Sequence, residues 1–363
     1  MKLLIRATLI LLMIHIILIA ITLSLSMVLT TNTTIAYTLR DTRDNSNDVI
    51  LMDTRTAVSM SMIQGIGVGN VTGRTPIWAA DGNALAFWTF HNREDIFVHE
   101  VQLAPYQQQN LIENEDYLSL PIYGVDNQRL LASFPTFNNV PIYLINDQYP
   151  DGDIIINNSQ FLPVWSPDGR YIAYTASYTV PEGEDDIDSG IDDNEIDIYI
   201  IDVASRDITN LTVETSASGQ PIWLPDASGI LFVSRQSNFG QLHRIELDTG
   251  TITELPIHLS PIDMPTLSPD GRYLAYTSSE RIGNQADIEV MLLDLETYEL
   301  RNVSNSLLYD NQPTWSPDSA YLAYVSRRFG DQDEIYMMAI STGKTRRLTY
   351  SNNDESDISW RPR

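Results

Sequence analysis

The stretch WSPDGRYIAY, residues 165–174, returns as LSPDGRYLAY at residues 267–276 and as WSPDSAYLAY at residues 315–324. Weaker copies raise the total to seven, with anchor residues 45, 42, 58, 44, 48 and 45 positions apart. The anchors are Trp78, Tyr123, Trp165, Trp223, Leu267, Trp315 and Trp360. A period near 45 residues that holds several short strands is typical of propeller blades.

The residues of one copy predict four strands. Proline stands two residues before the anchor in six of the seven copies, as expected for an edge strand, because proline has no amide to donate. Ser-Pro-Asp-Gly then predicts a tight turn. A β-rich second strand follows, for example at residues 171–175. Third strands are predicted at 196–202, 288–294 and 334–340, and a fourth at 344–349.

The two ends of the repeat region complement each other. Residues 34–38, 48–53 and 56–63 resemble the second, third and fourth strands of a blade that lacks its first strand. Residues 357–360 resemble a first strand with nothing after it. We therefore expect an all-β, seven-bladed propeller closed by one shared blade, which leaves no open sheet edge. Six blades is the alternative.

The core P-x-W-S-P-D-G-x-x-I-A-Y resembles the repeats of the TolB-like propeller family, also described as WD40-like or PD40 repeats. The resemblance covers residues 34–360. It implies a propeller like that of periplasmic TolB proteins, which bind protein partners, or like the one that gates prolyl oligopeptidase-type peptidases. The chain departs from both patterns: no helical domain precedes the repeats, no α/β-hydrolase domain follows them, and TolB itself has six blades.

The N-terminus predicts a membrane segment. Residues 7–29 contain no charge and follow Lys2 and Arg6, which favours a transmembrane helix with the propeller exported. A cleaved signal peptide, with residues 24–26 as a poor cleavage site, is the alternative. We expect an anchor at 1–30 and the propeller at 34–363. The chain has no cysteine, which excludes a lipoprotein anchor and favours a bacterial cell envelope.

The net charge of −26 opposes binding to nucleic acid, because phosphate backbones are repelled. Acidic residues are densest at 181–197, where carboxylates beside a glycine suggest a Ca²⁺ site. A solvated loop is the alternative, since the spacing does not match an EF-hand. No other cofactor is expected. The candidate ligands are Asp186, Asp188, Asp192, Asp193 and Glu195.

Sequence motifs favour binding over catalysis. The five histidines lack metal-ligand spacing, and no G-x-S-x-G motif is present. Length variation is concentrated in the loops that join strand two to three and strand four to the next blade, so binding is expected on that face. Polar residues just before the first strands are predicted to ring the channel mouth there. These are Arg74, Gln220, Asp263, Asp310, Gln312 and Asp357.

Two functions follow from these observations. The first is a membrane-anchored binding or scaffolding module that recognises a protein, peptide or glycan partner in the cell envelope. The alternative is an envelope hydrolase or lyase with acidic groups at the channel mouth. The absence of a catalytic motif in the sequence favours the first.

Overall fold

The computed structural model describes most of the repeat region. The residues described are 33–43, 46–62, 72–91, 95–103, 106–112, 122–124, 129–132, 140–145, 153–159, 163–177, 196–212, 221–234, 240–259, 262–282, 285–306, 308–328 and 332–362. Within these ranges the secondary structure is built from strands, so the all-β prediction is confirmed. No helix among the described residues is long and apolar enough to cross a membrane, and the predicted anchor at 1–30 lies outside them.

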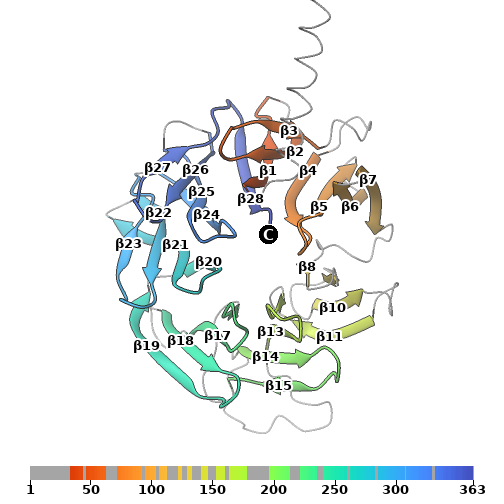
Figure 1. The fold of residues 1–363 in the computed structure, drawn as a ribbon, viewed down its shortest axis with the longest axis vertical. Helices are drawn as coiled ribbons and strands as arrows, with labels where there is room; N and C mark the ends of the chain where they lie inside the picture. The colour runs from red at the N-terminus through yellow and green to blue at the C-terminus, as the bar shows by residue number, and fades with distance from the viewer. Residues whose placement is uncertain are drawn as a thin grey trace, which may run out of the picture.

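The strands form seven four-stranded antiparallel sheets arranged around a common axis (Figure 1). The first three sheets, given from the innermost strand outward, contain β28 (Asp354–Trp360), β1 (Thr34–Arg40), β2 (Asn47–Asp53) and β3 (Ser59–Ser61); β4 (Thr72–Trp78), β5 (Ala84–His91), β6 (Asp95–Leu103) and β7 (Tyr106–Ile112); and β8 (Ile122–Tyr123), β9 (Arg129–Ala132), β10 (Val140–Ile145) and β11 (Asp153–Ser159).

The remaining four sheets repeat this order without a crossover. They contain β12 (Val164–Trp165), β13 (Tyr171–Ser177), β14 (Ile196–Asp202) and β15 (Ile208–Asn210); β16 (Ile222–Trp223), β17 (Gly229–Ser234), β18 (Gly240–Glu246) and β19 (Ile252–Leu259); β20 (Ile262–Leu267), β21 (Tyr273–Ile282), β22 (Gln285–Asp294) and β23 (Leu300–Asn302); and β24 (Asp310–Trp315), β25 (Tyr321–Ser326), β26 (Glu334–Ala339) and β27 (Thr345–Arg347).

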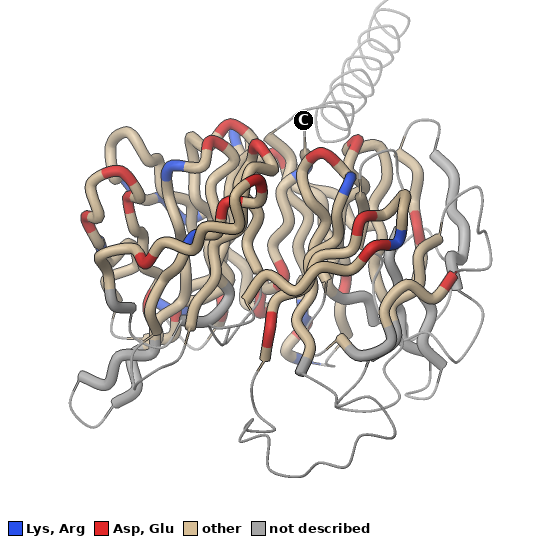
Figure 2. The backbone as a smooth tube through the Cα atoms, turned by 90° about the horizontal axis from the view of Figure 1, so that it is seen from below, with Lys and Arg blue, Asp and Glu red and all other residues tan. Residues whose placement is uncertain are grey.

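Antiparallel pairing divides the connections between two faces. The turns that join the first to the second strand and the third to the fourth strand of a sheet lie on one side, which we call the turn face. The connections from the second to the third strand, and from the fourth strand to the next sheet, lie on the other side, the loop face. Acidic residues outnumber basic ones over the described backbone, in keeping with 48 Asp and Glu against 22 Lys and Arg in the chain (Figure 2).

The Ser-Pro-Asp-Gly segments form tight turns, as predicted. In the turn after β12, the Ser166 hydroxyl donates to the Asp168 carboxylate over 2.6 Å and accepts from the amide of Tyr171. Gly169 has a φ of 72°, a value that an L side chain rarely adopts. The hydrogen bond from Ser166 is the main reason that the pKa of Asp168 is lowered. These contacts reverse the chain within a few residues.

The anchor tryptophans join neighbouring sheets. Trp223 Nε1 donates to the carbonyl of Val164, which lies one residue before the anchor of the preceding sheet, over 3.1 Å. Four other indoles repeat this bond at 3.1–3.2 Å; the pairs are Trp78 with Ser359, Trp165 with Ile122, Trp315 with Thr266 and Trp360 with Thr314. Because each bond links two innermost strands, the anchor positions fix the spacing of the sheets around the axis.

The last strand of the chain completes the first sheet. β28 pairs with β1, with Ile35 opposite Trp360 and Arg40 opposite Asp354. The indole of Trp78 in the next sheet donates to the carbonyl of Ser359 in β28. The prediction that fragments from the two ends of the repeat region share one sheet is therefore confirmed, although β28 begins three residues earlier than predicted.

Candidate functional site

The innermost strands are irregular near the loop face. β4, β20 and β24 each shift register against their partner between the fourth residue and the first residue before the anchor, and β1 shifts against β28 at the corresponding point. Thr75, Gln312 and Asp357, each three residues before an anchor, have φ of 53°, 53° and 54°. A positive φ costs a residue with a side chain about 1–2 kcal/mol, and bulges of this kind re-aim side chains next to binding sites.

Side chains of neighbouring strands hold two of these bulges. The amide of Thr75 donates to Thr38 Oγ1 over 3.0 Å. The amide of Asp357 donates to Gln312 Oε1 over 2.6 Å. Two residues that the sequence placed at the channel mouth, Gln312 and Asp357, are therefore neighbours on adjacent innermost strands. Both are partly exposed.

The other predicted mouth residues differ in their surroundings. Asp310 is fully buried, and Ser306 Oγ donates to its carboxylate over 2.5 Å. Burial raises the pKa of Asp310, and its side chain has no exposed surface in this structure. Arg74 and Asp263 lie in β4 and β20, but their side chains are outside the described part of the structure, as is the whole of Gln220.

Large apolar side chains are exposed on the loop face. Leu308 and Tyr309, between β23 and β24, are 40% and 41% exposed, and Tyr350, between β27 and β28, is 77% exposed. The Arg347 guanidinium lies 4.7 Å from the centre of the Tyr350 ring. The sequence analysis missed these residues. Their signal is an apolar pair directly before a first strand and an aromatic residue in an otherwise polar connection.

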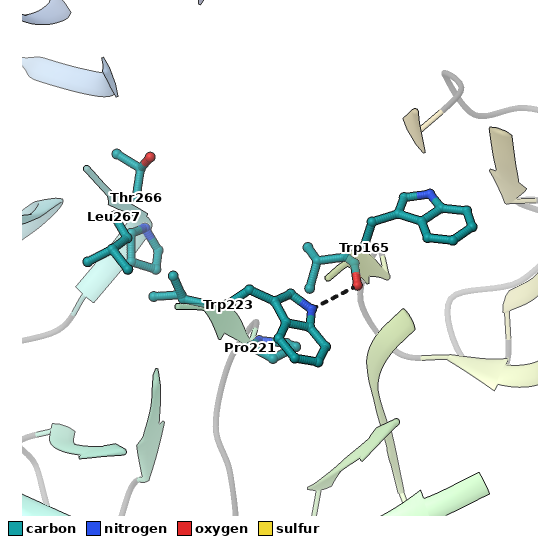
Figure 3. A pocket seen from close by; sticks show the side chains of 8 residues that line it. Trp165, Pro221, Trp223, Thr266 and Leu267 are labelled. Carbon is teal, nitrogen blue, oxygen red and sulfur yellow. Dashed lines mark hydrogen bonds between the residues drawn. The ribbon is translucent and has the colours of Figure 1, made fainter. Parts of the chain in front are cut away.

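A cavity of about 250 Å³ lies between the innermost strands of three successive sheets (Figure 3). It is lined by residues of β12, β16 and β20 and by two of the repeat prolines; these are Val164, Trp165, Pro221, Ile222, Trp223, Pro265, Thr266 and Leu267. The lining contains no charged side chain. Leu267 stands where five other copies have tryptophan, so the indole bond to the preceding sheet is missing beside this cavity. The cavity is therefore lined by uncharged groups, both polar and apolar.

A buried serine–histidine pair invites comparison with a nucleophile and its base. Ser234 Oγ and His243 Nε2 are 2.8 Å apart, and both residues are buried in the sheet of β16 to β19. Burial lowers the pKa of His243. Its Nδ1 atom has no hydrogen-bond partner, so no third group orients the ring as a catalytic base requires. The pair contributes to packing between β17 and β18.

Among the residues described, no group of three or more His, Cys, Asp or Glu side chains is arranged to hold a metal ion. The predicted Ca²⁺ ligands lie outside those residues, so that prediction stays as it was. The described part of the loop face therefore has two features that could serve binding: residues with positive φ at the innermost bulges, and the exposed tyrosines.

Comparison with known proteins confirms the TolB-like resemblance. Residues 258–363 match the model of the TolB beta propeller domain, PD40. An uncharacterized protein of Agrobacterium fabrum is 26% identical over 136 residues, covering 36% of this chain and 42% of the relative. Dipeptidyl-peptidase 5 of Porphyromonas gingivalis is 26% identical over 149 residues, covering 38% of this chain and 22% of the relative. The matches thus span less than half the length of either relative.

Solved structures share the fold at low sequence identity. TolB from Acinetobacter baumannii has a TM-score of 0.54 and 18% identity, with 91% of this chain and 83% of that chain covered. An oligogalacturonate lyase in complex with manganese has a TM-score of 0.61 and 12% identity, with 84% of this chain and 85% of that chain covered. The propeller domain of the Trilobed protease from Pyrococcus furiosus has a TM-score of 0.60 and 13% identity, with 89% of this chain and 96% of that chain covered. These similarities establish a β-propeller and nothing finer.

Proposed function

We propose that this chain is a seven-bladed, membrane-anchored and exported propeller that binds or scaffolds a partner in the bacterial cell envelope through its loop face. The partner is a protein, a peptide or a glycan. The observation that carries the proposal is the exposure of Leu308, Tyr309 and Tyr350 on the loop face. Apolar and aromatic side chains exposed on a rigid scaffold are typical of binding surfaces.

The chemistry of these side chains supports recognition. Tyrosine and arginine are enriched where protein partners meet, because both combine apolar contact area with hydrogen-bonding groups. Tyr350 stands beside Arg347, whose guanidinium also bonds to buried Glu334. The backbone of Tyr309 is held as well, since its carbonyl accepts from the amide of Arg327 over 3.0 Å. Both tyrosines therefore project from fixed positions.

We further propose that the chain is not an enzyme. The buried position of the Ser234–His243 pair and the burial of Asp310 support this proposal, because neither group can reach a substrate. An envelope hydrolase or lyase would need its catalytic side chains at the bulges of the innermost strands. Turnover of a peptide or glycan that is abolished by Asp263→Asn would support the enzyme instead.

The binding proposal is tested with alanine variants on both faces. The full chain is used to capture partners from an envelope extract, first as wild type and then as Tyr309→Ala/Tyr350→Ala. Tyr298 and Tyr321, both 38% exposed in or beside turns, supply the matched control on the turn face. We expect the loop-face variant to lose at least tenfold in captured partner and the turn-face variant to retain it. Equal capture by both variants would reject the loop face as the binding surface.

A further inference from the structure

Two carboxyl groups are buried where the ring closes. Glu334 is in β26 of the last sheet and is 5% exposed, while Glu355 is in β28 of the first sheet and is fully buried. We call the interface between these two sheets the closing seam. An apolar cluster that includes Tyr37, Ile335 and Trp360 joins the same two sheets. The proposed binding surface does not account for two acids at this point.

One hydroxyl contacts both acids. Thr349 Oγ1 lies 2.8 Å from Glu334 Oε2 and 3.2 Å from Glu355 Oε2, and it also accepts the amide hydrogen of Ile335 over 2.8 Å. A hydroxyl has a single hydrogen to donate. It can serve one carboxylate only, so the contact to the second acid is a hydrogen bond only when that acid brings a hydrogen of its own.

The surrounding charges identify the acid that carries the proton. Arg347 bonds to Glu334 Oε1 and neutralises that carboxylate. Among the residues described, no cation bonds to Glu355; Ser351 Oγ donates to its Oε1 over 2.5 Å. A carboxylic acid at Glu355 therefore donates from Oε2 to Thr349, which in turn donates to Glu334.

The other described groups around the seam add no positive charge to Glu355. Asp333 precedes β26, but it forms an ion pair with Arg327 at 2.9 Å, and the side chain of Asp354 accepts from the amide of Asp333. Burial raises the pKa of Tyr37 in β1, and the negative charges of nearby acids raise it further; these are Glu355, Glu334 and Asp48. Burial, with the charge of Glu334 adding to it, raises the pKa of Glu355 to about 8.

We propose that the proton on Glu355 acts as a clasp that holds the last sheet to the first across the closing seam. With the proton present, one chain of hydrogen bonds runs from Glu355 through Thr349 to Glu334. With the proton lost, two carboxylates share a buried space with one hydrogen between them, and they repel each other. The seam then loosens as the solution becomes alkaline.

The sheet before the last contains a related arrangement in which a cation acts on the second acid. Glu289, Ser304 and Ser306 occupy the positions 45 residues before Glu334, Thr349 and Ser351. There the Ser304 hydroxyl donates to Glu289, whereas Asp310 takes its hydrogen bond from Ser306. The Ser304 hydroxyl also contacts Asp310, and the positive charge of Arg328 acts to lower the pKa of Asp310. A hydroxyl between two acids is thus found at both seams, and the closing seam differs in that no cation of the described residues acts on Glu355.

The test measures hydrogen exchange of the full chain between pH 6.5 and 9.5, corrected for the intrinsic pH dependence of exchange. The reporters are the amides of Ile335, Leu348 and Glu355, which bond to Thr349 Oγ1 or to the backbone carbonyls of Ile335 and Asp333. We expect their protection to fall at least tenfold as the pH rises through about 8. The amides of Leu224 and Leu247, directly after β16 and β18 of another sheet, should stay constant.

Two variants separate the clasp from general alkaline loosening. Glu355→Gln has an amide that supplies the missing hydrogen at every pH. The protection of the seam amides in this variant should therefore not change with pH. Glu299→Gln removes an exposed acid in a turn and should behave as wild type. The same pH-dependent loss in Glu355→Gln as in wild type would overturn the proposal. If Glu355→Gln does not fold, the carbon resonance of the Glu355 carboxyl in the wild-type chain decides: titration above pH 7 supports the clasp, and titration below pH 6 rejects it.

Discussion

Gly124 shows how one residue accommodates the indole of the next sheet. A Cβ atom at this position would lie 2.5 Å from the Trp165 ring, far inside contact distance. The same indole donates to the carbonyl of Ile122 over 3.2 Å. The absence of a side chain at Gly124 therefore lets Trp165 approach the preceding strand closely enough to form its inter-sheet bond.

Gly124→Ala should lower the free energy of unfolding by about 2 kcal/mol, because the added methyl displaces the indole and weakens its hydrogen bond. Urea unfolding measures the loss. The control is Trp165→Leu, which gives this copy the residue found at Leu267 and removes the clash. Adding Gly124→Ala to Trp165→Leu should cost less than about 0.5 kcal/mol. A full additive loss in the double variant would show that the clash is not the cause.

At the scale of the element, β28 has two roles. It is the innermost strand of the first sheet, and it provides the Ser359 carbonyl that receives the indole of Trp78. Its own Trp360 donates to Thr314 in the last sheet. One seven-residue strand therefore connects three sheets.

Deletion of residues 357–363 should cost about 4 kcal/mol of unfolding free energy. Removing the buried Trp360 accounts for about 2 kcal/mol, and losing the two indole hydrogen bonds accounts for about 1 kcal/mol each. This is a large part of the 5–15 kcal/mol by which domains are typically stable. Thermal unfolding of the full chain checks the loss, with deletion of 362–363 as the control that keeps β28 intact. An unchanged melting temperature would contradict the assigned role of the strand.

The elements could be predicted from sequence far better than the site. Tryptophans, prolines and Ser-Pro-Asp-Gly turns recur at fixed offsets, so they predict strand order and the shared first sheet. The bulges could not be predicted in this way, because Thr75, Gln312 and Asp357 differ chemically and their positive φ depends on a neighbouring strand. The sequence predicts Asp310 at the channel mouth because this residue is polar and precedes a first strand. In the structure its carboxylate is buried, and the Ser306 hydroxyl supplies a hydrogen bond that makes this burial possible.

At the scale of the whole molecule, the described chain begins and ends on the same face. The amide of Thr54, in the turn between β2 and β3, donates to the carbonyl of Thr33 over 2.9 Å. The amide of Arg361 donates to the carbonyl of Thr34, and its side chain bonds to the carbonyl of Gly82 in the turn after β4. Both ends therefore lie at the turn face.

This arrangement predicts an orientation for the proposed anchored protein. With residues 1–30 in a bilayer, the turn face should lie against the membrane and the loop face should point outward. A protease added to intact spheroplasts should cut within residues 181–197 readily but the turns at 166–170 and 268–272 at least tenfold more slowly. Solubilisation in detergent should remove the difference. Equal cleavage on intact spheroplasts would reject the orientation.

The pairing of β28 with β1 also sets an order of events during synthesis. The indole of Trp78 and the carbonyl of Ser359 that receives it are 281 residues apart in the chain. Until the ribosome has made β28, β1 presents an unpaired edge, and contacts between such distant segments form late. An interrupted chain thus keeps an open strand that other strands can join, whereas a completed chain covers it.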